Sequence, residues 1–158
     1  MQEETRKSRC RILVLGVGHP LMGDDAAGLE AARLLRVKGC SCVEECPGGA
    51  ELCTHIVRAH SPEILVVVDA ALGLEPGEVV VYEGEPGPEW PIVSTHGFPP
   101  PLVHRLLADA ARRVVYLLLG VEKVELGVPL SVRTAEAVRK AAEVLLKVID
   151  CSPGRARG

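Results

Sequence analysis

The chain has 158 residues, of which 47% are hydrophobic and 25% charged, and its formal net charge is −3. These values are typical of a globular domain, and they exclude a disordered chain and disfavour a nucleic-acid-binding domain rich in Lys and Arg. The polar start, Met1–Ser8, lacks a signal-peptide pattern, and no apolar run reaches the ~20 residues of a membrane span. We expect one cytoplasmic domain, residues 1–158, with flexible tails at 1–9 and 152–158.

Short β-branched runs alternate along the chain with longer stretches of helical periodicity. In chain order, the patterns predict strand Ile12–Val17, helix Asp25–Arg36, strand Cys42–Glu45, helix Gly49–Ala59, strand Glu63–Ala70, strand Glu78–Glu83, a proline-rich loop at 86–101, helix Leu102–Ala111, strand Val114–Val121 and helix Ser131–Ile149. Ser131 is the expected N-cap of the last helix. Because the strands are apolar on both faces and helices separate most of them, we predict an α/β fold. It is a three-layer α/β/α sandwich around a mostly parallel, five-stranded mixed sheet.

Six cysteines require an explanation: Cys10, Cys40, Cys42, Cys46, Cys53 and Cys151. Their spacing lacks the paired C-x2-C units of structural zinc sites. For a cytoplasmic chain we predict buried free thiols, with disulfides or a metal site as the alternatives. The chain has no Asn and one Gln, as in proteins from hot sources, although six cysteines argue against such a source.

Ionisable residues follow the predicted strands, where ligands bind in open α/β sheets. The loop after the first strand carries Asp24 and Asp25, and we expect Asp24 to cap the following helix, which leaves Asp25 available. This loop has Leu21 where a dinucleotide-binding loop has its third glycine, so a nucleotide-binding domain is disfavoured. Asp69 ends a buried strand, where a carboxylate needs a partner or a metal. His96 lies in the proline-rich loop.

Together, Asp25, Asp69 and His96 would form a set of two oxygen ligands and one nitrogen ligand. Such a set suits divalent metals such as nickel, zinc or iron. The residues alone therefore predict a metal site without indicating its purpose.

The same residues give the chain a resemblance to a known family. The segment Ile12–Gly28 (ILVLGVGHPLMGDDAAG), the run Gly48-Gly49-Ala50-Glu51-Leu52, Val68-Asp69-Ala70, Thr95-His96, and Gly127 with Leu130-Ser131 are similar, in order and spacing, to the hydrogenase maturation endopeptidases. The resemblance runs from Arg11 to about Ile149. It implies that Asp25, Asp69 and His96 are both the metal-binding and the catalytic residues.

The resemblance also implies an unusual reaction. The protease would recognise nickel carried by the precursor of a nickel–iron hydrogenase large subunit, and would then remove a C-terminal extension from it. The isolated protein could hold another divalent metal. His19 stands where the family usually has Asn and is a possible additional ligand. We expect a monomer without nucleic-acid or membrane partners.

Three alternatives remain at this stage. One is a non-catalytic assembly factor that binds nickel or the immature subunit. The second is a peptidase of the same fold with a different protein substrate, and the third is the disfavoured nucleotide-binding domain.

Overall fold

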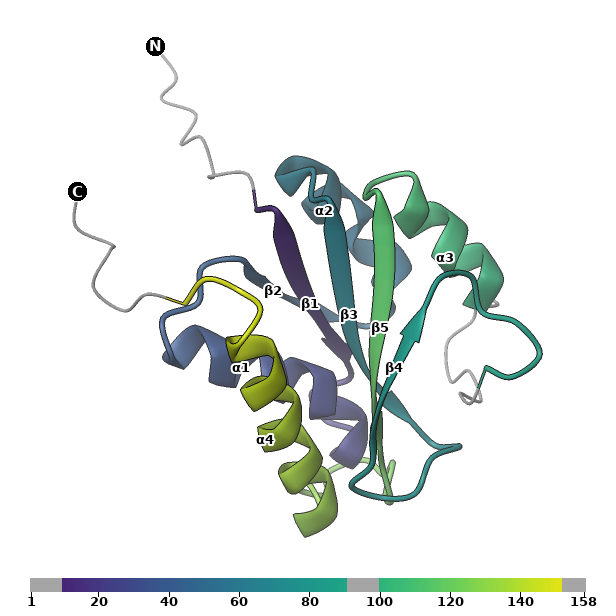
Figure 1. Cartoon of the computed structure of the whole chain (residues 1–158). Coiled ribbons are helices and arrows are strands. Elements are labelled where there is room, and N and C mark those ends of the chain that lie inside the picture. The colour runs from purple at the N-terminus through teal and green to yellow at the C-terminus, as the bar shows by residue number, and fades with distance from the viewer. Residues whose placement is uncertain (1–9, 91–99, 152–158) are drawn as a thin grey trace.

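The computed structural model describes residues 10–90 and 100–151 (Figure 1). The strands are β1 (Ile12–Gly18), β2 (Val43–Pro47), β3 (Ile64–Ala71), β4 (Val79–Glu83) and β5 (Arg113–Gly120). The helices are α1 (Ala27–Val37), α2 (Thr54–His60), α3 (Pro100–Ala108) and α4 (Val132–Leu146), with 3-10 turns η1 (Gly23–Ala26) and η2 (Ala50–Cys53). The predicted tails, residues 1–9 and 152–158, lie outside the described residues.

The five strands form one mixed sheet, which confirms the predicted fold class. The strand order is β2-β1-β3-β5-β4, with parallel pairing except for β4, which is antiparallel to β5 at the sheet edge. Helices α1 and α4 cover one face of the sheet, and α2 and α3 cover the other (Figure 1). Within the described part of the chain, no helix combines the length and apolar character needed to cross a membrane.

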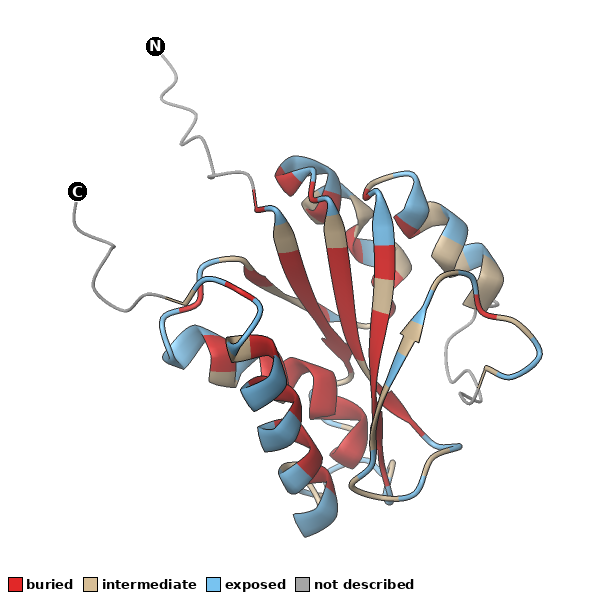
Figure 2. Cartoon of the chain, in the orientation of Figure 1, coloured by how far each residue is buried: buried red, intermediate tan, exposed pale blue. Residues whose placement is uncertain are grey.

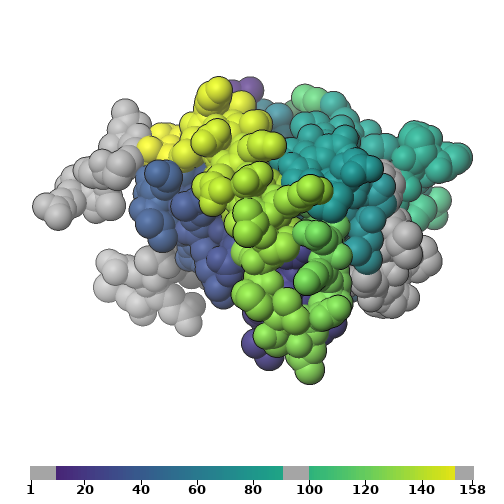
Figure 3. Space-filling view, turned by 90° about the horizontal axis from the view of Figure 1, so that it is seen from below, coloured from purple at the N-terminus to yellow at the C-terminus, as the bar shows by residue number. Residues whose placement is uncertain are grey.

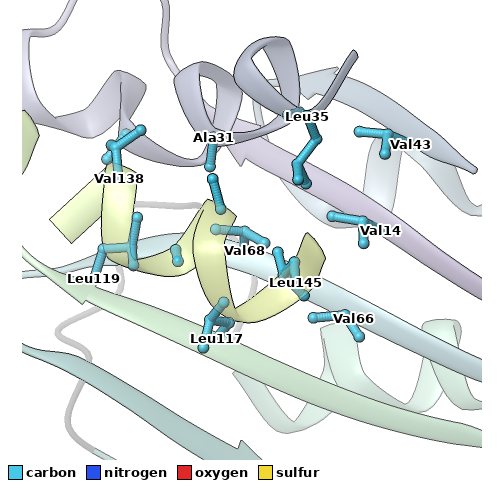
Figure 4. Close-up of a cluster of buried hydrophobic side chains, with 14 of the residues drawn as sticks. Val14, Ala31, Leu35, Val43, Val66, Val68, Leu117, Leu119, Val138 and Leu145 are labelled. Atoms are coloured by element: carbon cyan, nitrogen blue, oxygen red, sulfur yellow. The ribbon is translucent and has the colours of Figure 1, made fainter. Parts of the chain in front are cut away.

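The strand side chains alternate between two hydrophobic clusters, one on each face of the sheet. In β1, Val14 packs in the α1/α4 cluster, whereas Leu13 and Leu15 pack in the α2/α3 cluster. Figure 2 shows that burial runs along the central strands and the inner faces of the helices. Figure 4 shows the α1/α4 cluster, in which Leu145 of α4 lies over the sheet. A sheet covered on both faces explains why its strands read as continuous apolar runs.

Some helix boundaries differ from the predicted ones. Helix α3 begins at Pro100, inside the predicted loop, because proline is tolerated in the first turn, where no intrahelical N–H donor is required. The predicted helices Asp25–Arg36 and Gly49–Ala59 each begin as a 3-10 turn before becoming α-helical. Ser131 caps α4 as predicted, and its Oγ accepts a hydrogen bond from Thr134 N at 3.4 Å.

The prediction of free thiols is wrong, because all six cysteines form disulfides. The pairs are Cys10–Cys42, Cys40–Cys151 and Cys46–Cys53. The sheet explains the first pair: β1 and β2 are neighbours, so the residues just before them meet at the same edge. These contacts depend on strand pairing and on where the chain returns after α4. Cysteine spacing does not reveal them.

The Cys40–Cys151 disulfide should contribute strongly to stability, because the two residues are separated by 111 positions in the sequence. Closing a long loop restricts the unfolded chain, so replacing both cysteines by alanine should lower the free energy of unfolding by about 2–5 kcal/mol. Urea denaturation without reductant measures this difference. After full reduction of all disulfides, wild type and variant should converge. Equal stability without reductant would show that this disulfide does not stabilise the fold.

Candidate functional site

The parallel strands end at a common edge of the sheet, at the bottom of Figure 1, and the candidate site lies there. Asp25 belongs to η1, which follows β1, and Asp69 belongs to β3, the strand beside β1. Gly28 allows the start of α1 to approach both strands, since a Cβ at this position would collide with the carbonyl oxygens of Val17 and Val68. The close contact of α1 with the sheet brings η1 to the end of β3.

Asp69 is a strongly perturbed carboxyl group. Its pKa is raised to about 8: burial is the largest cause, the negative charge of Asp25 adds to it, and a hydrogen bond from Ala70 N to Oδ1 at 2.8 Å partly opposes the shift. Asp25 itself is 4% exposed. The two carboxyl groups therefore lie close enough to interact electrostatically, with Asp25 buried and Asp69 half-buried.

Glu51 is a third acidic residue at this edge, and sequence reasoning did not assign it a role. Its charge also raises the pKa of Asp69, and its Oε2 is buried without a hydrogen-bond partner among the described residues. Its carboxylate lies over Gly49, where a Cβ would collide with it. The turn before it is held to the first loop by a hydrogen bond from Gly48 N to Gly18 O at 2.9 Å. The sequence feature that could have identified Glu51 is an acidic residue close to a Gly-Gly turn that directly follows a strand.

Asp24 does not cap a helix, contrary to the prediction. Its fully buried carboxylate accepts hydrogen bonds from Glu122 N at 2.9 Å, Lys123 N at 2.8 Å, and Ser131 N and Oγ at 2.7 and 2.8 Å. Burial alone would raise its pKa, but these hydrogen bonds outweigh burial and the pKa lies below its ordinary value. Asp24 therefore joins the first loop to the segment after β5, a contact 98 to 107 residues away in sequence.

Of the two histidines named for the predicted site, only His19 lies among the described residues. His19 lies beside Asp25, with 3.9 Å between Nε2 and Oδ2, so it is placed near the candidate ligands. His96 lies outside the described residues. Within residues 10–90 and 100–151, no group of three or more His, Cys, Asp or Glu side chains is arranged to hold a metal ion.

An aromatic cluster lies beside Asp69 on the α2/α3 face. Burial, together with the charge of Asp69, raises the pKa of Tyr116 well above its ordinary value, so its phenol stays neutral. The Tyr116 hydroxyl and His104 Nδ1 are 2.9 Å apart, and the ring contacts Trp90 edge-on with 4.9 Å between centroids. This cluster contributes low-polarity surroundings that disfavour an ionised Asp69.

The raised pKa of Asp69 predicts a pH dependence of stability in the metal-free protein. Between the ordinary pKa of 3.8 and about 8, the folded state keeps a proton that the unfolded state has lost. Stability should therefore fall as pH rises from 5 to 8, by up to about 1.4 kcal/mol per pH unit. Asp69→Asn should remove this component, since the amide stays neutral and its Oδ1 can still accept from Ala70 N.

Urea denaturation of both proteins at pH 5 and pH 8, with a chelator present, isolates this effect, because the other titrating groups are shared. Asp24, whose pKa is lowered, loses its stabilising effect only in more acidic solution. Parallel pH profiles for wild type and Asp69→Asn would contradict a raised Asp69 pKa.

The fold and site define a class of protein: an α/β sandwich with an interacting pair of acidic residues at the carboxyl edge of its sheet. The family model HycI, described as hydrogenase maturation protease, matches residues 42–149. The chain belongs to the hydrogenase maturation protease family. It is therefore a hydrolase of the endopeptidase type.

Solved structures agree with this assignment. The NiFe hydrogenase maturation protease HybD from Thermococcus kodakarensis is 28% identical, with a TM-score of 0.66 over 89% of this chain and 99% of that one. HycI from Thermococcus kodakarensis KOD1 is 25% identical, with a TM-score of 0.70 over 87% and 91%. The endopeptidase HycI from Escherichia coli is 26% identical, with a TM-score of 0.69 over 84% and 86%. No curated protein sequence matches the chain significantly.

Proposed function

We propose that this protease removes the C-terminal extension of a nickel–iron hydrogenase large-subunit precursor after nickel has been inserted. Asp25, Asp69 and His96 recognise the bound nickel, which arrives with the substrate and is not a resident cofactor. The protease acts as a cytoplasmic monomer. Six cysteines as free thiols would argue against a hot source, but three disulfides in a cytoplasmic protein are characteristic of hyperthermophiles, in agreement with the absence of Asn.

The interaction between Asp25 and Asp69 is the observation that carries this proposal. The buried Asp25 and the half-buried Asp69 repel each other when both are ionised, and a divalent cation between them would offset both the repulsion and the cost of burial. Oxygen ligands with one imidazole suit nickel among several divalent metals. Because part of the ligand set would come from the precursor, recognition would require protein and metal together.

Cleavage is hydrolysis of one peptide bond. A water oxygen adds to the carbonyl carbon, the carbon–nitrogen bond breaks, and the leaving nitrogen takes a proton. Two routes for activating the water fit the site: general-base catalysis by one of the aspartates, or polarisation of the water by the substrate's metal. In both, Asp25 and Asp69 position the metal-bearing segment of the precursor.

Intact-mass spectrometry of a candidate large-subunit precursor tests the proposal directly. The precursor is incubated with the protein, with and without prior nickel loading. We expect loss of a C-terminal peptide only from the nickel-loaded precursor. Complex formation without any change in mass would instead support a non-catalytic assembly factor. Cleavage independent of nickel would contradict metal recognition, and cleavage of an unrelated protein only would indicate a different substrate.

A further inference from the structure

Exposed leucines are concentrated at one end of the molecule. Among residues 10–90 and 100–151, five leucines are exposed: Leu21 at 69%, Leu52 at 61%, Leu72 at 43%, Leu102 at 42% and Leu126 at 74%. Leu21, Leu52, Leu72 and Leu126 follow the carboxyl ends of β1, β2, β3 and β5, and Leu102 is in the first turn of α3. We call these five residues the leucine rim.

Backbone hydrogen bonds hold most of the segments that carry the rim against one another. Gly127 N donates to Leu21 O at 2.8 Å, which places the turn of Leu126 against the first loop. Val121 N donates to Ala71 O at 3.3 Å, so the segments after β5 and β3 leave the sheet together. Figure 3 looks onto this end of the molecule, where the green segment after β5 lies beside the teal segment after β3. The segments of Leu21 and Leu126, and those after β3 and β5, therefore lie side by side at the carboxyl edge of the sheet.

Three rim leucines are close in sequence to the acidic residues of the candidate site. Leu21 precedes Asp25, Leu52 follows Glu51, and Leu72 follows Asp69. The same short segments thus supply both the acidic residues of the site and apolar surroundings. Exposed apolar side chains grouped in this way typically mark a binding surface.

We propose that the leucine rim docks an apolar segment of the precursor, the segment that carries the bound nickel. This inference rests on the proposed function and adds the surface that recognises the substrate around its metal. Charge complementarity selects this occupant: a positive ion faces the carboxylates while apolar side chains cover the leucines. A second copy of this chain fits poorly, because docking through the same face would bring two acidic centres together.

Docking through the rim predicts a specific kinetic change. Leu21→Ser combined with Leu126→Ser should raise KM for the nickel-loaded precursor by about 10- to 100-fold and leave kcat within about threefold. Both side chains are exposed, so the melting temperature should not change. The matched control is Val37→Ser combined with Val148→Ser, because these residues are 85% and 56% exposed and lie outside the rim.

The measurement is cleavage rate against precursor concentration, followed by intact mass. KM equal to that of the valine control, or a loss confined to kcat, would overturn the docking surface while leaving the proposed function intact. If wild type binds the precursor without cleaving it, the protease function fails. In that case, calorimetric affinities of the same variants for the precursor test the leucine rim as a docking surface. Equal affinities for wild type and the leucine variant would overturn it. A wild-type dimer that the leucine substitutions dissociate would overturn it in favour of self-association.

Discussion

Asp69→Asn should abolish processing of the nickel-loaded precursor while leaving the protein folded. Asparagine preserves the shape of the side chain and the hydrogen bond to Ala70 N, but it removes the negative charge that would bind the metal. Metal-assisted charge stabilisation is worth several kcal/mol, so we expect a rate decrease of ~10³-fold or more. The same substitution should not destabilise the metal-free protein at pH 7, because it removes a carboxyl group whose ionised form is disfavoured by burial.

The test compares cleavage by wild type and variant under single-turnover conditions, with intact mass as the readout. Asp25→Asn and His96→Ala should show the same loss, since the proposal gives them the same role. Glu143→Gln, which changes an exposed carboxylate on α4, is the matched control and should cleave as wild type does. Wild-type rates for all three site variants would sink the assignment of the site.

Asp24→Ala should have the largest effect on stability. The substitution leaves the partly buried backbone N–H groups of Glu122, Lys123 and Ser131 without their carboxylate acceptor. An unsatisfied buried donor typically costs about 1–3 kcal/mol, so we expect the loss of three such hydrogen bonds to lower stability by about 3–5 kcal/mol. Because these groups hold the segment after β5 against the first loop, the position of Asp25 should also be affected, and activity should fall together with stability.

Urea denaturation at pH 7 measures this loss, with Asp109→Ala as the control because Asp109 is exposed in the turn after α3. The control should stay within about 0.5 kcal/mol of wild type. Asp24→Asn should be intermediate, since the amide keeps one acceptor oxygen. A stability loss no larger than that of Asp109→Ala would show that the Asp24 network is not structural.

The amino-acid sequence was sufficient to predict the layered fold. Apolar runs such as Ile64–Val68, separated by amphipathic stretches, are the direct consequence of a sheet buried on both faces. The order and spacing of the motifs around Asp25 and Asp69 also carried the family resemblance. Separately, loops after neighbouring parallel strands meet at one edge of the sheet, which predicted that the two residues belong to one site. These features depend on local periodicity and on residues close in sequence, and both can be read without coordinates.

Contacts between distant segments required the tertiary structure. Aspartate before a helix is a typical N-cap residue, but the hydrogen-bond partners of Asp24 lie about a hundred residues away. Only the return of β5 beside β3 brings them together. Cysteine pairing depends in the same way on strand neighbours and on the end of α4. Likewise, the positions of Glu51 and of the leucine rim near the other site residues follow only from the meeting of several chain segments at the carboxyl edge of the sheet. Sequence periodicity records which face of an element is buried, whereas the identity of its neighbours is set by how the whole chain packs.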